Sequence, residues 1–339
     1  MTKSKEVKLK KYGTYWERNT ASGGYLLRHD VGQVMIKIIR FVLLFGLCFL
    51  ILEPIFNKIS VSFMEKQDLY NPIVVSIPIH FTGKNYQVAA SIMSYKESLK
   101  NSIVISLTIA ILQTVMCTIV GYGFSRFKFP LKNLWFACVM ALIIVPPQAF
   151  SSSLVLHFNN YDILGIIKLI KGAPINLRGS VLPYYLMSAT CMGLKNGLYI
   201  YLVRQFFRNI PVDLEEAAYI DGCGMFKTFI RIMVPQSKPI VTSCFLFSLV
   251  WQWTDGFYSK LFIGGKKLVS TSLATIADSL GVYVARELGM VNAQTNVSTQ
   301  YTNCIMSTGT LLIVFPIVLV YLVAQKAFVE SISSTGIKM

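Results

Sequence analysis

The sequence predicts an all-α integral membrane protein with six transmembrane helices. Hydrophobic residues make up 54% of the 339 residues and charged residues only 14%, a balance that would be hard to keep in solution for a chain of this length. Three windows contain no charged residue and exceed the roughly 18 residues that indicate a spanning helix. They run over residues 102–125, 133–157 and 305–325.

Three further spans are interrupted by one to three charged residues each. They cover residues 34–56, 181–203 and about 240–262. Lys37 and Arg40 stand near the start of the first, where long basic side chains can extend to the membrane surface. With six spans, both termini lie on the same side of the membrane.

Basic residues set the expected orientation. In a soluble chain, the net charge of +16 would suggest binding to nucleic acid. Here the lysines and arginines are concentrated in the N-terminal tail, in the short connection "RFKFPLK" and around residues 204–238. The positive-inside rule places these segments in the cytoplasm, so no nucleic-acid partner is expected and the aromatic, basic tail is expected to lie along membrane lipids. Residues 57–100 also hold five lysines, but long loops cross the membrane largely regardless of charge.

Two spans contain features that interrupt a regular helix. The adjacent prolines of "VPPQ", Pro146 and Pro147, must break the hydrogen-bond ladder of the third span. In the fourth span, Gly193 and Gly197 have the GxxxG spacing of close helix contacts, and Lys195 between them marks either an interface or a pore. The loop 57–100 contains the strand-like run "NPIVVSIPIHF" and is expected to form a small extracellular cap.

The seven cysteines show no CxxC pair, and the three histidines are far apart. We therefore expect neither a metal site nor a disulfide framework, and no cofactor. The phosphate-binding pattern GxxxxGK[ST] is also missing from the sequence. Paired acids, HExxH or a serine–lysine arrangement inside a span would indicate a membrane enzyme, and the sequence has none of them. We therefore expect that this chain is not an enzyme.

An acidic, alanine-rich stretch, "PVDLEEAAYIDGCGMFKTFIRIMVPQSKP", lies between two apolar runs. The acidic residues that begin at Asp213 would interact favourably with the dipole at the N-terminus of a short helix. Gly222 is typical of the position where a helix ends. A second helix is predicted from about Gly224 to just before Pro235. Ala217 and Ala218 give the first helix a face with almost no side chain, so another surface can approach closely. The alternative is a solvated linker, which would have no reason to expose apolar residues beside these alanines.

This stretch resembles the EAA signature of the permeases of ABC importers. The matching residues are Glu216, Ala217, Ala218, Asp221, Gly222, Ile232 and Pro235. Further segments, "GYGFSRFKFP", "VPPQ", "WQWTDGF" and "QKAFVESISSTGIKM", are similar to carbohydrate-type permeases such as the maltose subunit MalG. The resemblance extends from about residue 101 to the C-terminus, and Cys223 departs from it where alanine is usual.

The resemblance implies a type I importer permease (MetI-like) fold with an extracellular loop after the first span. The expected organisation is a basic cytoplasmic tail 1–33, a first transmembrane helix 34–56, the extracellular loop 57–100, a core permease domain 101–325 and a cytoplasmic tail 326–339. Within the core, residues 207–238 would be the coupling loop that docks on the ATPase, with Glu216, Ala217, Ala218, Asp221, Gly222 and Pro235 at the contact.

The resemblance also implies partners and a location. The expected partners are a second, MalF-like permease, two ATP-binding subunits that hydrolyse ATP, and an extracellular solute-binding protein. The expected location is the bacterial inner membrane, crossed several times. Oligosaccharide is the expected cargo, and a permease for polyamine, phosphate or amino acid is the alternative.

One stripe of the fifth span could line the substrate pathway. Cys244, Ser248, Trp251 and Asp255 follow one another at helical spacing and combine an aromatic plane with polar groups, which is how proteins bind sugars. Trp253 points to nearly the opposite side. The alternative is that Asp255 lies at the outer water interface and that both tryptophans belong to the aromatic belt of the membrane.

Overall fold

The computed structural model describes residues 14–290 and 295–336, with side chains as far as residue 326. The part of the basic tail in residues 1–13 and the last residues of the C-terminal tail lie outside this range. The chain divides into two compact units, residues 1–61 and 62–339, which are described separately. Within the described residues the elements are helices joined by turns, with two isolated β-bridges, so the all-α prediction is confirmed.

The first unit consists of α2 (Tyr15–Ala21) and most of α3 (Tyr25–Ser62). Helix α3 contains the predicted span 34–56 and continues beyond it at both ends. Among the described residues, it is one of three helices that are long and apolar enough to cross a membrane.

The second unit begins with the loop that was expected to form a cap. It contains α4 (Lys66–Leu69) and α5 (Lys84–Ile92). The strand-like run forms turns and bends rather than a strand, and an isolated bridge joins Met64 to Phe81. The buried carboxylate of Asp68 closes the loop, because it accepts hydrogen bonds from the backbone N–H groups of Ile79 and His80 at 2.8 and 2.7 Å.

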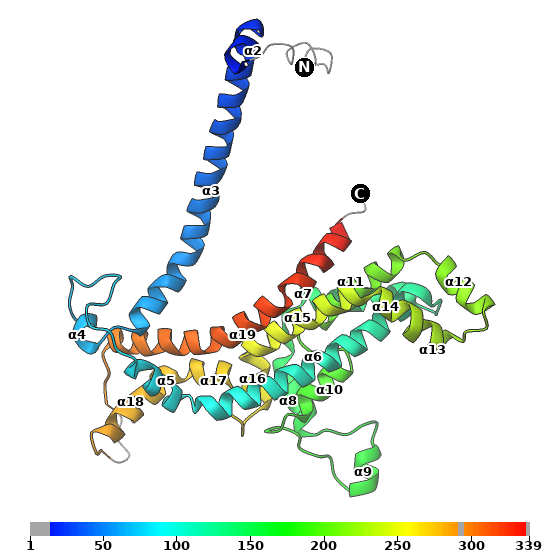
Figure 1. The fold of residues 1–339 in the computed structure, drawn as a ribbon. Coiled ribbons are helices and arrows are strands. Elements are labelled where there is room, and N and C mark those ends of the chain that lie inside the picture. Colours follow the sequence, from blue (N-terminus) through cyan, green and yellow to red (C-terminus); the bar gives the residue numbers. More distant parts are fainter. Residues whose placement is uncertain (1–13, 291–294, 337–339) are drawn as a thin grey trace. The chain divides into compact units, whose positions relative to one another are not determined.

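Helix α6 (Tyr95–Arg126) is the central element of the second unit (Figure 1). It packs against α11 (Asn196–Asn209) and α15 (Lys238–Thr254), and α15 packs in turn against α19 (Thr299–Gly336). The remaining elements are α7 (Lys132–Ile144), η1 (Pro147–Phe150), α8 (Ser151–Asn159), α9 (Ile166–Lys171), α10 (Leu182–Ala189), α12 (Asp213–Ile220), α13 (Met225–Thr228), η2 (Phe229–Met233), α14 (Val234–Gln236), α16 (Phe257–Phe262), α17 (Val269–Ala274) and α18 (Ile276–Glu287).

The predicted spans differ in continuity. By length and composition, α6 and α19 can each cross a membrane, as α3 can, whereas α7 and the helical stretch from Pro147 to Asn159 meet at an angle of 105°. The predicted break at the two prolines is thus confirmed. The predicted span 181–203 is divided into α10 and α11, and the predicted span 240–262 is divided into α15 and α16. The total of six spans therefore stays a prediction.

Two glycines permit close packing around α6 and α11. A Cβ added at Gly121 would lie 2.7 Å from Val203 Cγ1, and one added at Gly197 would lie 2.8 Å from the Val139 carbonyl oxygen. Gly193 is not on this helix face, because it precedes α11 and leaves room for the Gln113 side chain. The expectation of a continuous GxxxG helix face was therefore wrong.

We predict that Gly121→Val destabilises the protein by about 1–3 kcal/mol, since a side chain there would overlap Val203. Gly123→Ala is the matched control in the same helix: its Cβ would meet Phe127 at an ordinary 3.8 Å. The midpoint of thermal unfolding in detergent measures both. Equal midpoints for Gly121→Val and wild type would contradict the close packing.

Candidate functional site

The loop between α11 and α15 begins with the short helix α12, which ends in a Schellman motif. The N–H of Cys223 donates to the Ala218 carbonyl at 2.9 Å, and the N–H of Gly222 donates to the Tyr219 carbonyl at 3.0 Å. Gly222 has a φ of +78°, a conformation that glycine adopts without a steric penalty. The predicted helix stop at Gly222 is confirmed.

The second helical stretch of the loop runs further than predicted. It begins with α13 at Met225 and continues through η2 and α14 to Gln236, so the prediction that it ends before Pro235 was wrong. The segment η2 is a π-helical turn. Wider π turns are one way in which a helix accommodates a disrupted hydrogen-bond ladder, and proline disrupts the ladder because it lacks an N–H.

A buried ion pair ties the loop to the end of α6. The Arg126 Nε donates to Glu215 Oε1 at 2.7 Å, and an Nη of Arg126 donates to the Ile210 carbonyl at 2.8 Å. The side chains of Arg126 and Glu215 are 10% and 5% exposed. The Tyr122 hydroxyl also lies 3.4 Å from Glu215 Oε2. The start of α12 is thereby fixed to the core by Glu215 rather than by its neighbour Glu216.

Most residues of the predicted contact lie on the open surface of this loop. Glu216, Ala217, Asp221, Gly222 and Pro235 are exposed, whereas Ala218 is buried against the chain itself. Exposed apolar side chains surround them. These are Leu214, Tyr219, Ile220, Met225, Phe226 and Ile230. The loop therefore presents an apolar surface next to an exposed acidic residue, which is typical of a protein contact.

We predict that Glu215→Ala lowers the free energy of unfolding by about 3–5 kcal/mol, because it leaves the buried Arg126 without its counter-charge. Glu216→Ala is the matched control, since it removes the same group from the adjacent exposed position and should change stability by less than about 0.5 kcal/mol. Thermal unfolding of both purified variants measures the difference. Similar destabilisation by the two substitutions would mean that the ion pair does not anchor the loop.

A polar cluster lies in the core between α6, α15 and the turn before α11. The Gln113 Nε2 donates to the Leu194 carbonyl at 3.2 Å, and Gln113 Oε1 accepts a hydrogen bond from the Ser248 hydroxyl. The Gln252 Nε2 also approaches Gln113 Oε1, at 3.4 Å. These side chains are buried, so Ser248, one of the predicted pathway residues, is occupied by a contact within the subunit.

The other predicted pathway residues differ in accessibility. Asp255 is 7% exposed, and its carboxylate accepts from the backbone N–H of Ser259 at 2.9 Å and from the Tyr184 hydroxyl at 2.9 Å. Trp251 is partly exposed, and the Lys195 ammonium lies 4.7 Å from its ring centroid. Trp253 is buried and donates from Nε1 to the Ile313 carbonyl at 3.1 Å. Of the three predicted residues, Trp251 alone is accessible.

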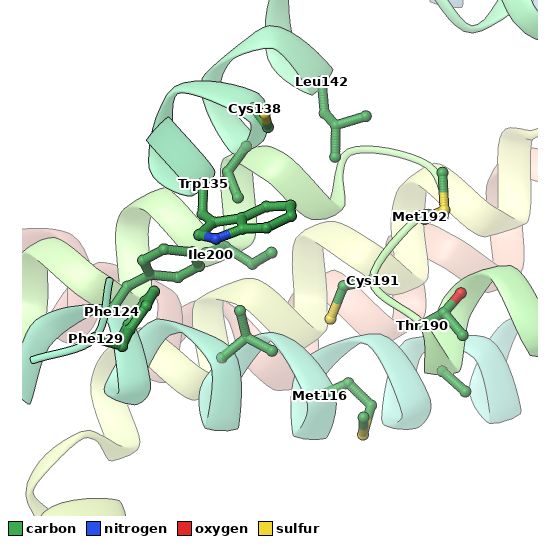
Figure 2. Close-up of a pocket in the computed structure, with 13 residues that line it drawn as sticks. Met116, Phe124, Phe129, Trp135, Cys138, Leu142, Thr190, Cys191, Met192 and Ile200 are labelled. Atoms are coloured by element: carbon green, nitrogen blue, oxygen red, sulfur yellow. The ribbon is translucent and has the colours of Figure 1, made fainter. Parts of the chain in front are cut away.

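A cavity of about 730 Å³ is lined in part by the turn between α10 and α11. Figure 2 shows Trp135 and Ile200 on one side of it and Cys191 and Met192 of the turn on the other. Thr190 is the one lining side chain with a hydroxyl, and the others are apolar or sulfur-containing. Such a lining lacks the polar groups that sugar hydroxyls need, so this cavity is not the candidate sugar site.

Two features of the site were not identified from the sequence. From the sequence, Glu215 was expected only to interact with the dipole at the N-terminus of the helix. Glu215 and Ala218 are three residues apart and therefore lie on one face of α12, and this face is buried. The turn that separates α10 from α11 had no proline to mark it.

The chain was compared with known families and proteins. Residues 113–334 match the family described as binding-protein-dependent transport system inner membrane component. The chain is similar to the probable ABC transporter permease protein YurM of Bacillus subtilis, with 24% identity over 312 residues, 91% of this chain and 89% of that protein. It is also similar to the sn-glycerol-3-phosphate transport system permease protein UgpE of Escherichia coli, with 27% identity over 289 residues, 83% of this chain and 90% of that protein.

A probable ABC transporter permease protein of Pyrococcus horikoshii is 28% identical over 197 residues, which cover 57% of this chain and 65% of the relative, just under two thirds of its length. Among solved structures, the chain resembles a bacterial ABC transporter involved in the import of the acidic polysaccharide alginate. The TM-score is 0.61 at 16% identity, and the match covers 88% of this chain and 98% of the other. At this identity the likeness concerns the fold.

Proposed function

The chain belongs to the family of binding-protein-dependent transport system inner membrane components, and from this premise we propose that it forms half of the pathway of an ATP-driven oligosaccharide importer. As an ABC importer permease it works with other ABC transporter components and does not itself hydrolyse ATP. In the proposed assembly a second, MalF-like permease completes the pathway, two ATP-binding subunits supply energy and an extracellular binding protein delivers the sugar. The complex would lie in a bacterial inner membrane, crossed by this chain six times.

The proposed contact with the ATPase is the exposed surface of α12 and α13. Several of its apolar side chains are largely exposed: Ile220 and Phe226 are 87% and 75% exposed. Ala217 leaves space for a close approach, and Glu216 offers a carboxylate to cationic or N–H groups of the partner. Because the Arg126 to Glu215 ion pair fixes the start of α12, a displacement of the docked loop would act directly on the end of α6.

The single observation that carries this proposal is the combination of a rigid anchor, Glu215, with an adjacent exposed contact residue, Glu216. Exposed apolar residues on a flexible linker would not transmit force, whereas this loop is joined to a core helix by a buried ion pair. A carbohydrate cargo is supported by the resemblance to sugar-type permeases and by the accessible Trp251, since tryptophan faces stack on the C–H faces of sugars.

We predict that Gly222→Val and Glu216→Lys reduce the amount of ATPase that co-purifies with the permease or uncouple hydrolysis from uptake. Valine at a φ of +78° costs roughly 1–2 kcal/mol and would distort the end of α12. Insertion into the membrane and pairing with the second permease should be unchanged, because the spans do not depend on this turn.

Gly224→Val is the matched control for Gly222→Val. A Cβ at either position meets no atom within 4 Å, but Gly224 has an ordinary φ of −73°. Co-purification and ATPase assays on detergent-solubilised complexes measure the effect. Normal ATPase content and normal sugar-stimulated hydrolysis in both Gly222→Val and Glu216→Lys would show that this surface is not the contact.

We also predict that Trp251→Ala lowers sugar uptake without reducing assembly, because its ring is accessible and lies beside a charged group. Trp253→Ala should instead act through stability, since that side chain is buried and bonded to α19. Uptake by proteoliposomes, normalised to assembled complex, distinguishes the two. Normalised uptake equal to wild type in Trp251→Ala would remove this residue from the pathway.

A further inference from the structure

If the uncharged part of α6 crosses the membrane, the turn between α10 and α11 lies near the middle of the bilayer. Gln113 stands 13 residues after Lys100 and 13 residues before Arg126, the charged residues that bound the uncharged part of α6. At about 1.5 Å per residue it is roughly 20 Å along the helix from each. The hydrogen bond from Gln113 to the Leu194 carbonyl, 3.2 Å long, fixes the turn at the same depth.

Lys195, which directly follows Leu194 in the turn, is charged and exposed on this subunit. An ammonium group facing hydrocarbon at this depth would be costly, and intramembrane charges almost always face the interior of a bundle or a water-filled cavity. Irregular backbone at membrane depth is likewise tolerated only against protein or water. The exposed side of Lys195 therefore faces either the pathway or the second permease rather than lipid.

The local conformation of Lys195 is unfavourable in two respects. It has a φ of +63°, uncommon for a residue with a side chain, and it places a positive charge at the N-terminus of α11. The electrostatic cost would fall if an anion occupied this position, because helix N-termini and ammonium groups favour negative charge. The next residue, Asn196, is 1% exposed, and neither polar atom of its side chain has a hydrogen-bond partner within the described residues.

Lys195 and Trp251 come together from different elements. The ammonium lies 4.7 Å from the centroid of the Trp251 ring, and the Tyr199 ring lies 6.5 Å from that ring. No ion pair among the described residues includes Lys195. The acidic residue of the predicted stripe, Asp255, is already bonded to Tyr184 and to the first turn of α16. The positive charge is thus left without a counter-charge from the described residues.

We propose that Lys195 and Trp251 form a subsite for an anionic saccharide, one that bears a carboxylate or a phosphate. The ammonium would pair with the anionic group while the tryptophan face packs on the sugar ring. This inference rests on the proposed function, since it assigns a substrate class to that pathway. The competing arrangement is a structural ion pair between Lys195 and an acidic residue of the second permease.

The test uses the complete transporter, with its binding protein and ATPase subunits, in proteoliposomes. Uptake of three radiolabelled probes is measured: digalacturonate, a hexose phosphate and a neutral hexose disaccharide. We expect wild type to carry an anionic probe, Lys195→Met to reduce that uptake about tenfold or more, and Lys195→Arg to retain most of it. Lys66→Met is the matched control, because the Lys66 ammonium also lies 4.7 Å from an aromatic centroid, that of Tyr301 at the start of α19.

Three other outcomes would contradict the subsite or the proposed function. If wild type carries only the neutral disaccharide, or if Lys195→Met keeps anionic uptake within twofold of wild type, the subsite is refuted and the importer proposal stands. If Lys195→Met reduces the amount of assembled complex, with uptake per complex unchanged, Lys195 pairs with the second permease instead. If no probe is taken up in an ATP-dependent manner, the proposal of a saccharide importer itself fails.

Discussion

The hydrogen bonds of Gln113 are the contact on which the membrane part of this structure depends. Inside a bilayer, backbone carbonyls released by a helix break need a partner from the protein, because water is excluded from hydrocarbon. Gln113 supplies that partner to Leu194 and, through its side-chain oxygen, also holds Ser248 of α15. One amide therefore joins the central helix, the turn between α10 and α11, and the fifth predicted span. The absence of a side chain at Gly193 makes room for it.

Helix α6 connects this polar centre to the loop between α11 and α15. Its middle carries Gln113 and its last residue is Arg126, which is paired with Glu215 at 2.7 Å. The helix between these two residues is continuous, and Gly121 allows it to lie directly against α11. A contact made at α12 and a group bound beside Lys195 would thus act on the same rigid element. This arrangement gives the proposed coupling a physical route, which does not require the loop and the pathway to be close together.

The sequence allowed several elements to be predicted because their physical causes are local. Uncharged windows predict spanning helices, two prolines break a helix, and Gly222 ends one. The break after α10 and the role of Glu215 could not be predicted in this way, because both depend on partners remote in the chain. Gln113 stabilises a turn about 80 residues later, and Arg126 determines which of two adjacent glutamates is buried. Local patterns do not contain that information.

The predicted stripe of the fifth span also could not be placed correctly from local spacing alone, and its actual position determines the charge of the accessible surface. Its spacing assumed a continuous helix through Asp255, but α15 ends at Thr254 and Asp255 instead accepts hydrogen bonds from the start of α16. The expected carboxylate is thereby removed from the accessible surface, while Trp251 and the adjacent Lys195 remain on it. A sugar site formed by a tryptophan and a carboxylate would accept neutral hydroxyls. A site formed by a tryptophan and an ammonium without a counter-charge favours a ligand that brings the negative charge itself.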